Sequence, residues 1–536
     1  MPKRVIVVTG GVLSGLGKGI ISSSISRILL SKGFSVENLK IDPYLNVDAG
    51  TMRPTEHGEV WVTRDGGEID EDLGHYERFS GVKTSKKNNI TSGKIFFTVL
   101  NKERKGDYLG KTVEPIPHVT DEIIKHINSF DCDFLVLEVG GVVGDYENIL
   151  FLEALRILKT RIGKDIVFAH TVYVPIPDHL GEPKTKPAQH SLRSLRTIGL
   201  NPDLLFVRVK GGLDKPRMEK ISLNASLNAD KVIISPDTDL IYRLPLIFEE
   251  QNFSNKLFEI LGLKKSSNDL VEWKEVVAKH DSLKEEIRIG LVGKYIKTGE
   301  YDLKDSYVSV EQALFIAGIH LGKRVVIDWI DTEDFSKSDL DNVCGVVVPG
   351  GFGNKGVEGK IEAIRYCREN KIPFLGLCFG LQLSVIEFAR NVLGIKNANS
   401  EEFSEEGDLF VKFIPEMKNL LQKNGFGASM RLGEWEAKLK IDSKVRFIYG
   451  KESVGLRHRH RYEICPTKYR VLEDNGFMIS GSNPKLGVCE FMELKDHPFF
   501  IGTQAHPEFD AQFLKPEPLF YEFVKTCSQK QFKESN

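Results

Sequence analysis

The N-terminal stretch RVIVVTGGVLSGLGK, residues 4–18, is the feature that most constrains the fold of this chain. It begins with a short β-branched apolar run, continues through a glycine-rich turn, and from Ile20 its apolar residues recur at helical spacing. This order predicts a strand, a loop and a helix. Such a loop can hold a phosphate, because glycines let the backbone approach closely and the helix N-terminus adds a positive dipole.

The loop departs from the general phosphate-loop pattern in two ways. One more residue than usual separates Gly11 from Gly17, and Gly19 stands where Ser or Thr normally binds magnesium. Lys18 would supply the positive charge, but a metal ion would have to be held by acidic residues elsewhere. A strand-to-helix turn without any ligand is the alternative interpretation of these residues.

Acidic residues for a metal ion occur in two places in the first half. Glu138 ends the buried apolar run DFLVLEVGG, where an acid commonly holds the Mg²⁺ that bridges phosphates. The segment EIDEDLGHYERF adds Asp70, Glu71 and Asp72, which taken singly are expected on a solvated loop. Because the phosphate loop lacks its own metal hydroxyl, we expect at least one of the three to bind metal.

The segment GEPKTKPAQH places Lys184 and Lys186 between prolines, which stiffen the loop that carries them. Two cations held in this way suit a second polyphosphate. The alternative is that they only make the surface more polar.

Alternating strand-like runs and amphipathic helices predict an α/β fold, with a doubly wound parallel sheet in the first half. Strands are expected over residues 134–139, 166–174 and 204–209, and a second series begins at Ile287. The charged stretch between the two series predicts a linker with a short helix around Trp273. The expected domains are therefore residues 1–265 and 287–536, with a linker over 266–286.

Composition narrows the class of protein further. The formal net charge of -2 disfavours bulk binding to nucleic acid or to a membrane surface. The seven cysteines are odd in number and include no CxxC pair, which argues against a disulfide framework and a zinc site. No apolar stretch is long enough to span a bilayer. We therefore expect a cytoplasmic protein that binds neither nucleic acid nor membrane.

Cys378 is the predicted nucleophile of the second half. The string PFLGLCFGLQLSVIEFAR predicts a strand, a sharp turn at Gly376 to Gly380, and a helix. This is the thiol form of a nucleophile elbow, in which small neighbours allow a strained turn that exposes the side chain at a helix N-terminus. The alternative is a small buried hydrophobic cysteine.

A thiolate nucleophile also needs a base and an oxyanion hole. The string TQAHPEF offers His506 with Glu508 two residues later, which could orient the imidazole. The backbone N–H groups near Gly351, in VPGGFG, and of Phe379 at the elbow could form the oxyanion hole. The run HRHRYE, residues 458–463, could bind a metal through its histidines, but a carboxylate-binding arginine is the favoured interpretation.

Together these strings resemble the CTP synthase family over essentially the whole chain. The first half is similar to the amidoligase domain through TGGVLSGLGKG, KIDPYLNVDAGTM, HGEVWVT, DLGHYERF, EVGGVVGDYEN and KTKPAQHS. The second half is similar to a class I glutamine amidotransferase through VPGGFG, GLCFGLQ, MRLG, RHRHRYE and HPEF. The resemblance implies that glutamine is hydrolysed at Cys378 through a thioester, and that the ammonia converts ATP-activated UTP to CTP, with release of ADP and phosphate.

The resemblance also implies roles for individual residues. The catalytic triad would be Cys378, His506 and Glu508. Residues for ATP would be Gly15, Leu16, Gly17, Lys18, Gly19, Ile20, Asp72, Pro236, Asp237 and Thr238, and Asp72 and Glu138 would bind Mg²⁺. Residues for UTP or the inhibitor CTP would be Ser14, Asp145, Tyr146, Glu147, Lys184, Thr185, Lys186, Pro187, Ala188, Gln189 and Lys220. Residues for glutamine would be Gly351, Phe379, Gly380, Leu381, Gln382, Glu402 and Arg461, and the ammonia route would be lined by Pro54, His57 and Val60.

Three residues depart from the usual family pattern. Val142 replaces a threonine, Ala505 an aromatic residue before HPE, and Lys355 an arginine in the GFG turn. The first two lie beside substrate positions, and the third, with the altered turn near Arg431, bears on activation by GTP. The resemblance further implies a homotetramer.

Two other functions fit parts of the same pattern. A cobyrinate-type amidase also joins a phosphate-loop domain to a glutaminase, but KTKPAQ and DLGHYERF argue against it. A nucleotide-sensing scaffold or filament protein with a dead active site is the other alternative. The complete set of Cys378, His506 and Glu508 argues against that alternative.

Overall fold

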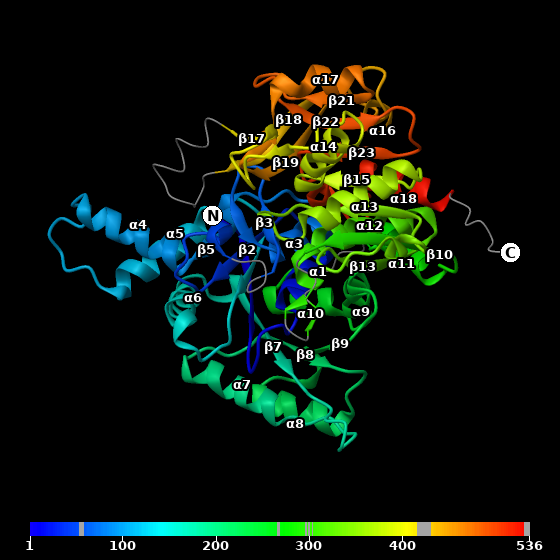
Figure 1. The fold of residues 1–536 in the computed structure, drawn as a ribbon. Coiled ribbons are helices and arrows are strands. Elements are labelled where there is room, and N and C mark those ends of the chain that lie inside the picture. Colours follow the sequence, from blue (N-terminus) through cyan, green and yellow to red (C-terminus); the bar gives the residue numbers. More distant parts are fainter. Residues whose placement is uncertain are drawn as a thin grey trace. The chain divides into compact units, whose positions relative to one another are not determined.

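The computed structural model describes residues 1–52, 58–264, 269–294, 297–298, 301–302, 304–414 and 430–529. The chain divides into two units (Figure 1). Unit 1 comprises Met1–Asp48 and Asp72–Val277, and unit 2 comprises Ala49–Glu71 and Ala278–Asn536. A short segment of the N-terminal half therefore belongs by its contacts to unit 2.

Unit 1 is built on a seven-stranded sheet in which every neighbouring pair of strands is parallel. In sheet order the strands are β5 (Asn89–Thr91), β2 (Val36–Asp42), β6 (Phe134–Val139), β1 (Arg4–Gly10), β7 (Ile166–Tyr173), β8 (Leu204–Val209) and β9 (Val232–Pro236). The predicted parallel sheet is confirmed. Since ligands of such sheets bind at the carboxyl ends of the strands, the loop after β1 lies where a nucleotide is expected.

Helices cover this sheet on both faces. They are α1 (Lys18–Ser31), α3 (Asp72–Ser80), α4 (Ser92–Arg104), α5 (Thr120–Asn128), α6 (Ile149–Ile162), α7 (Lys186–Thr197), α8 (Lys215–Ala225), α9 (Leu244–Glu250), α10 (Phe253–Leu261) and α11 (Val271–Asp281). Residues of α5 and α6 share one buried cluster with alternate residues of β1, β2 and β6. α1 packs against α3 and α9 as well as the sheet.

The helix expected around Trp273 is present as α11 and is anchored by that tryptophan. The Trp273 ring is fully buried, and its Nε1 donates a hydrogen bond of 2.6 Å to the carbonyl oxygen of Tyr242. Phe79 and the Arg27 guanidinium pack on the same ring, with centroid distances of 5.5 Å and 5.2 Å. Residues 271–277 of the predicted linker are therefore part of the packed structure of unit 1.

Unit 2 contains a nine-stranded mixed sheet. In sheet order the strands are β13 (Arg324–Asp331), β10 (Glu286–Gly293), β14 (Gly345–Val348), β15 (Phe374–Leu377), β23 (Phe500–Thr503), β22 (Cys489–Leu494), β21 (Phe477–Ser482), β18 (Arg431–Leu439) and β19 (Ser453–His460). Pairing is parallel from β13 to β23 and antiparallel from β23 to β19. The second series of strands, expected from Ile287, is present and begins with β10.

Smaller elements complete unit 2. Its helices are α12 (Val308–Leu321), α13 (Val357–Glu369), α14 (Phe379–Asn391), α16 (Lys444–Tyr449), α17 (Tyr469–Asp474) and α18 (Pro518–Ser528). Its short strands are β3 (Val60–Val62), β4 (Glu68–Asp70), β11 (Lys297–Thr298), β12 (Tyr301–Asp302), β16 (Ala398–Ser400), β17 (Asp408–Phe413) and β20 (Tyr462–Ile464). The β3–β4 hairpin lies in the segment that unit 2 takes from the N-terminal half.

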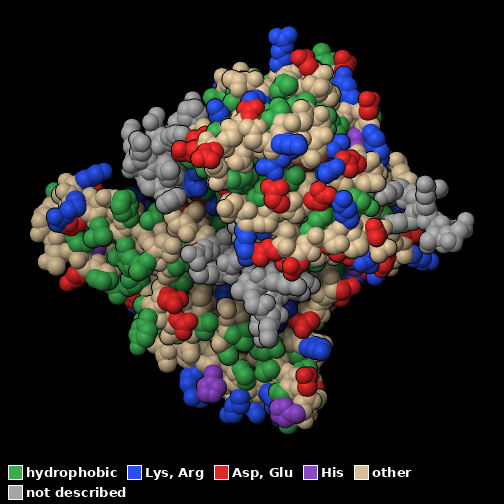
Figure 2. Space-filling model, in the orientation of Figure 1, with side chains coloured by type: hydrophobic (Ala, Val, Ile, Leu, Met, Phe, Trp, Pro, Cys, Tyr) green, Lys and Arg blue, Asp and Glu red, His purple; other side chains and the backbone are tan. Residues whose placement is uncertain are grey.

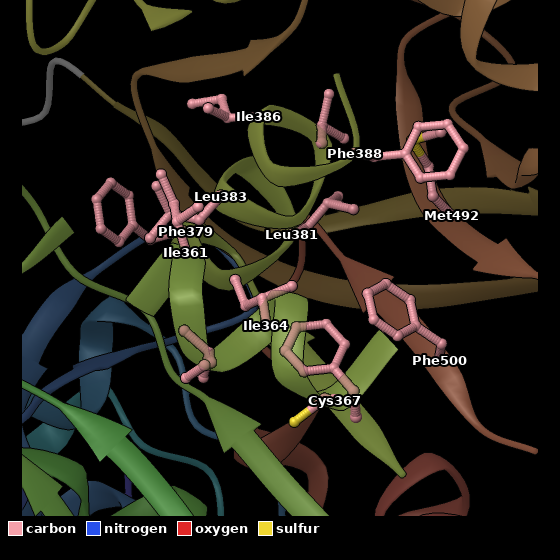
Figure 3. Packing of buried hydrophobic residues seen from close by; sticks show 14 of the residues in the cluster. Ile361, Ile364, Cys367, Phe379, Leu381, Leu383, Ile386, Phe388, Met492 and Phe500 are labelled. Atoms are coloured by element: carbon pink, nitrogen blue, oxygen red, sulfur yellow. The ribbon is translucent and has the colours of Figure 1, made fainter. Parts of the chain in front are cut away.

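A single apolar cluster fixes α13 and α14 on the sheet of unit 2 (Figure 3). Ile361 and Ile364 of α13, Leu381 and Phe388 of α14, and Phe500 of β23 all contribute to it. Burying a large apolar side chain contributes about 1.5–3 kcal/mol relative to leaving it exposed. The cluster therefore holds the first turn of α14 firmly, directly after Cys378.

All seven cysteines are buried free thiols. None of the helices in the described ranges combines the length and the apolar character that a membrane crossing requires.

Candidate active site

The phosphate loop joins β1 to α1, and its backbone enters the left-handed region at Gly15 (φ +72°) and Gly17 (φ +80°). Glycine adopts this region without the steric cost that a side chain imposes. α1 begins at Lys18, whose ammonium group is almost fully buried and donates a hydrogen bond of 2.9 Å to the carbonyl oxygen of Gly141. The lysine predicted to supply positive charge is therefore fixed at a helix N-terminus.

Asp72 lies directly against the start of this helix. A Cβ atom at Gly19 would fall 2.1 Å from Asp72 Oδ1, so glycine is the residue that leaves room for the carboxylate. The Lys40 ammonium group pairs with Asp72 and also donates a hydrogen bond of 2.9 Å to Glu138 Oε1. Tyr76 donates its hydroxyl to the other oxygen of Glu138. The two predicted metal-binding acids thus share one lysine beside the phosphate loop.

Asp72 and Glu138 offer oxygen ligands of the kind that Mg²⁺ prefers. In the part of the chain that the structure describes, no group of three or more His, Cys, Asp or Glu side chains forms a metal site. Mg²⁺ in phosphoryl-transfer sites is commonly held by one or two carboxylates together with substrate phosphates. The pair therefore fits an ion that arrives with a nucleotide.

Arg208 connects the loop with the segment expected to line the adenine. Its guanidinium donates a hydrogen bond of 2.7 Å to Asp237 Oδ1. A Cβ atom at Gly17 would lie 2.9 Å from its Nη1 atom. Pro236 ends β9 and Thr238 folds back by accepting a hydrogen bond of 3.2 Å from the Leu240 N–H. The Arg208 guanidinium therefore bonds to Asp237 and also lies close to Gly17 of the phosphate loop.

Buried hydrogen bonds join α7, which continues the KTKPAQ segment, to β1. His170 Nδ1 lies 2.8 Å from Thr9 Oγ1, and its Nε2 lies 2.7 Å from Ser191 Oγ. Burial lowers the pKa of His170 to about 3, so the ring is neutral at physiological pH. A Cβ atom at Gly11 would fall 1.9 Å from Ser191 Oγ, which shows how closely α7 approaches the loop.

The segment 145–147, predicted to bind pyrimidine nucleotide, lies at the surface. Tyr146 is 94% exposed, and Asp145 and Glu147 beside it are exposed as well. A Cβ atom at Gly141 would lie 3.8 Å from Glu147 Oε2, and Gly141 is also the acceptor for Lys18. The segment is therefore close to the lysine of the phosphate loop.

The other predicted pyrimidine-nucleotide residues differ in their surroundings. Thr185 and Ala188 are buried, and Gln189 Nε2 donates a hydrogen bond of 3.0 Å to Thr185 Oγ1. Lys184 pairs with Glu182. Ser14, Lys186 and Lys220 are exposed and Pro187 is half-buried. Within the described residues, no hydrogen bond or ion pair joins the Lys220 ammonium group on α8 to the phosphate loop.

Cys378 occupies a strained turn between β15 and α14, with φ +51° and ψ -98°. Non-glycine residues rarely adopt positive φ, and such strain is typical of functional positions. A Cβ atom at Gly376 would lie 2.8 Å from the carbonyl carbon of Gly380, and one at Gly380 would lie 2.2 Å from the Val348 oxygen. Both flanking glycines are therefore needed for the turn, as expected for a nucleophile elbow.

His506 and Cys378 face the same glycine. A Cβ atom at Gly350 would lie 2.9 Å from His506 Cε1 and 3.8 Å from Cys378 Cβ. His506 Nδ1 lies 2.7 Å from Glu508 Oε1. Burial by itself lowers the pKa of His506, but the charges of Glu508 and Cys378 outweigh it and raise the pKa to about 10. His506 is therefore protonated at neutral pH and can donate a proton to a leaving group.

Aromatic packing fixes the His506 ring. It stacks on Phe509 with ring centroids 5.3 Å apart, and Phe509 packs in turn on Trp61 of β3 at 4.7 Å. The Arg457 guanidinium lies over the Trp61 ring at 4.7 Å and donates a hydrogen bond of 2.9 Å to Asp510 Oδ1. Phe509 thus holds the His506 ring in place, and Trp61 of the β3–β4 hairpin holds Phe509.

A chain of buried carboxamides ends on the nucleophile. Gln504 Nε2 donates to Cys378 Sγ at 3.5 Å. Gln382 Nε2 donates to Gln504 Oε1 at 3.2 Å and to the carbonyl oxygen of Tyr462 at 2.8 Å. The amide nitrogen of Gln382, a residue predicted to bind glutamine, therefore positions Gln504.

A cavity of about 80 Å³ opens at the triad and is lined by Gly351, Cys378, His506 and Glu508. Val60, predicted for the ammonia route, lines it too, whereas Pro54 and His57 lie outside the described residues.

The remaining predicted glutamine residues surround the glycine turn or belong to the core. Glu402 accepts a hydrogen bond of 2.6 Å from the Gly353 N–H, and burial raises its pKa. Burial lowers the pKa of Arg461, while the charge of Glu402 acts in the opposite direction. Leu381 is fully buried in the apolar cluster, and Gly380 is packed against β14.

One arginine of the HRHRYE segment binds a carboxylate of the chain itself. Arg459 donates a hydrogen bond of 2.8 Å to Glu68 Oε1, which is buried in β4. His458 Nδ1 lies 3.1 Å from His460 Nε2, and both rings are buried. Burial lowers the pKa of each ring well below its usual value, so the pair is neutral.

The three departures from the family pattern lie in different surroundings. The carbonyl oxygen of Val142 accepts a hydrogen bond of 3.0 Å from Asn148. Ala505 is buried directly before His506. The exposed Lys355 pairs with Glu333 at 2.5 Å.

Four polar residues of these sites were not singled out from the sequence: Lys40, His170, Arg208 and Gln504. His170 interrupts β7, a strand that is otherwise largely apolar and buried, which is the signal that could have identified it. Lys40 carries no such signal, because β2 also contains Glu37, Asn38 and Asp42. Gln504 stands two residues before His506 at the end of β23. Arg208 carries no comparable signal, because it reaches its partner only through the pairing of β8 with β9.

A parallel α/β unit with a phosphate loop, joined to a unit with a cysteine nucleophile elbow, is typical of glutamine-dependent ligases.

The family model described as CTP synthase N-terminus matches residues 4–263, and the model described as glutamine amidotransferase class-I matches residues 302–526. The CTP synthases of Methanopyrus kandleri and Carboxydothermus hydrogenoformans are each 46% identical to this chain, covering 98% and 97% of it and 99% and 98% of their own lengths. The CTP synthase of Sulfolobus acidocaldarius is 44% identical over 98% of this chain and 99% of its own. A solved glutaminase domain of Trypanosoma brucei CTPS with bound acivicin is 34% identical, covers 46% of this chain and 95% of that domain, and has a TM-score of 0.41.

The chain belongs to the CTP synthase family. The predicted family is therefore confirmed, together with its function as a glutamine-hydrolysing ligase of pyrimidine nucleotide biosynthesis. The cobyrinate-type amidase is set aside, because relatives that match nearly the full length are CTP synthases.

Replacing Gln504 by leucine tests the carboxamide chain. Gln504→Leu removes the donor to the Cys378 sulfur while keeping a side chain of similar size, so glutamine hydrolysis is expected to slow about tenfold or more, as for loss of a hydrogen bond to a charged group. The measurement is kcat/KM for glutamate release. CTP formation from added ammonia is the control and should stay unchanged; a variant with normal glutamate release would contradict the role of Gln504.

Proposed function

We propose that this chain makes CTP by a division of labour between its two units. Unit 2 releases ammonia from glutamine, and unit 1 uses ATP to activate UTP for attack by that ammonia. The observation that carries the proposal is the buried set of Cys378, His506 and Glu508, which lies at a strained elbow and includes the 2.7 Å contact between His506 and Glu508. The set of Lys18, Asp72 and Glu138 in unit 1 supports the other half.

In unit 2 the Cys378 sulfur attacks the side-chain amide carbon of glutamine. A carbon–sulfur bond forms, and the carbonyl electron pair moves to the oxygen, which the N–H groups of Gly351 and Phe379 would stabilise. The carbon–nitrogen bond then breaks, and the departing nitrogen takes a proton from His506 to leave as ammonia. His506 next takes a proton from water, which attacks the thioester and releases glutamate and the thiolate.

In unit 1 the terminal phosphoryl group of ATP is transferred to a uracil carbonyl oxygen of UTP. Ammonia then adds to the activated carbon, and phosphate leaves to give CTP. Lys18 would neutralise charge on the transferring group, and its position at the start of α1 suits that role. Mg²⁺, held by Asp72 and Glu138, would supply further charge neutralisation at the phosphates.

The ligand contacts inferred from the family resemblance are also proposals. Residues 15–20 and 236–238 would bind ATP, and residues 145–147 and 184–189, with Ser14 and Lys220, would bind UTP or CTP. Glu402 and Arg461 carry opposite charges, which suits recognition of the α-ammonium and α-carboxylate groups of glutamine.

Regulation, assembly and location extend the proposal. We infer feedback inhibition by CTP, activation by GTP, a homotetramer and a cytoplasmic location. An apolar surface on unit 1 supports the homotetramer: Phe97 and Leu100 of α4 are each 61% exposed, and hydrophobic side chains gather there in Figure 2. A nucleotide-sensing scaffold without catalysis remains the weaker alternative, since it would not need a strained cysteine paired with a charged base.

The proposed division of labour predicts a specific pattern for Cys378→Ala. The variant should lose CTP formation from glutamine by at least about a thousandfold, because the covalent route is gone. It should keep CTP formation from added ammonia, because unit 1 is unaltered. Both rates can be followed from the change in absorbance as UTP becomes CTP.

Lys18→Met is the matched control, because it alters only the phosphate loop. It should lose CTP formation from either nitrogen source while still releasing glutamate. If ammonia failed to restore CTP formation in Cys378→Ala, or if Lys18→Met made CTP normally, the division of labour would be wrong.

The homotetramer can be tested on the exposed face of α4. The double variant Phe97→Glu, Leu100→Glu places like charges on that face, so the particle mass measured by light scattering with UTP and ATP should fall at least twofold. Phe447→Glu is the control, since Phe447 is 82% exposed on α16 of unit 2. An unchanged mass for the double variant would remove this face from the assembly.

A further inference from the structure

Lys360 of α13 is a buried charge that the proposed mechanism does not use. Its side chain is fully buried, and its Nζ atom has no hydrogen-bond partner among the residues that the structure describes. Lysine is almost never fully buried unless it is paired, because removing an ammonium group from water is costly. A buried ammonium group without a hydrogen-bond partner would be stabilised by any negative charge that develops nearby.

The Lys360 side chain lies against the two residues assigned to the oxyanion hole. A Cβ atom at Gly351 would lie 3.8 Å from Lys360 Nζ and 3.7 Å from Phe379 Cδ1. The Lys360 Nζ atom lies 5.2 Å from the centroid of the Phe379 ring. The Lys360 amine thus lies beside both Gly351, in the turn after β14, and Phe379, the first residue of α14.

Few other charges act on Lys360. Burial lowers the pKa of Lys360 to about 7, Lys294 after β10 lowers it further, and Glu402 after β16 raises it. Glu402 already accepts a hydrogen bond of 2.6 Å from the Gly353 N–H. On α14, the acid that faces α13 is Glu387, which pairs with Arg368 at 2.8 Å. The nearby titratable groups of the triad are Cys378 and His506, and the charge of Cys378 raises the pKa of His506.

We propose that Lys360 is a positioning residue for glutamine hydrolysis, whose ammonium group makes the oxyanion hole of Gly351 and Phe379 more positive. The proposal rests on the proposed function of unit 2. When the Cys378 sulfur bonds to the amide carbon, the carbonyl electron pair becomes a full negative charge on oxygen. Lys360 exchanges no atom with the substrate. It stabilises that charge through space, where low polarity makes a nearby cation effective.

The sign of the pH dependence follows from the protonation of Lys360. Below pH 7 the ammonium form dominates in the free enzyme, and above pH 7 the neutral amine dominates. The contribution of Lys360 should therefore be complete at pH 6 and lost towards pH 9. A variant without the amine lacks the contribution at every pH.

Lys360→Met tests the inference, because methionine keeps the length and burial of the side chain without its charge. The measurement is kcat/KM and kcat for glutamate release between pH 6 and pH 9. Relative to the unchanged enzyme, kcat/KM of the variant should be about tenfold lower at pH 6, a smaller loss than for removal of a direct oxyanion donor. The difference should shrink to less than twofold at pH 9, and KM should change little.

Two controls separate this inference from a structural effect. Lys337→Met removes an exposed lysine of the same unit, paired with Glu362 at 2.9 Å, and should not alter the pH profile. Lys360→Gln is a second neutral variant and should behave like Lys360→Met. CTP formation from added ammonia should be normal in all three. A purely structural role for Lys360 would lower activity by the same factor at every pH.

The outcomes distinguish this inference from the proposed function. If the unchanged enzyme releases no glutamate, the proposed function of unit 2 fails. If it releases glutamate and the two Lys360 variants match it at every pH, or differ by a factor independent of pH, the role of Lys360 is overturned.

Discussion

The close approach of backbone segments around Cys378 is the constraint on which unit 2 depends. Cys378 keeps a positive φ only because Gly376 and Gly380 let β15, α14 and β14 pack with no side chain between them. The apolar cluster under α14 resists relaxation of that turn, since core packing leaves little free volume. Strain at the nucleophile is therefore maintained by burial elsewhere, and the thiol is presented at a helix N-terminus where negative charge is favoured.

In unit 1 the candidate nucleotide site is organised by buried charges and not by backbone strain. Its phosphate loop has glycine at residue 19, and the space that a side chain would fill is taken by the Asp72 carboxylate. Lys18 and Lys40 are buried beside Asp72 and Glu138, so two cations and two anions nearly balance where a polyphosphate is expected. A buried ion set of this kind adds little to stability but fixes geometry.

The sequence predicted the features that depend on residues close together in the chain. The runs 134–139 and 204–209 are strands with those bounds, and the elbow at Cys378 followed from its glycines. His506 and Glu508 were found because they are close in the chain. Lys40 and Lys360 were missed, because their significance depends on partners, or on the lack of a partner, that only the packed fold determines.

The segment Ala49–Glu71 belongs by its contacts to unit 2, although the chain on both sides of it belongs to unit 1. It provides Glu68 to Arg459 and Trp61 to Arg457 and Phe509. Neither unit is thus a continuous piece of polypeptide. A gene fragment that begins at residue 278 would encode the catalytic triad but would leave Arg459 without its buried counter-ion, Glu68.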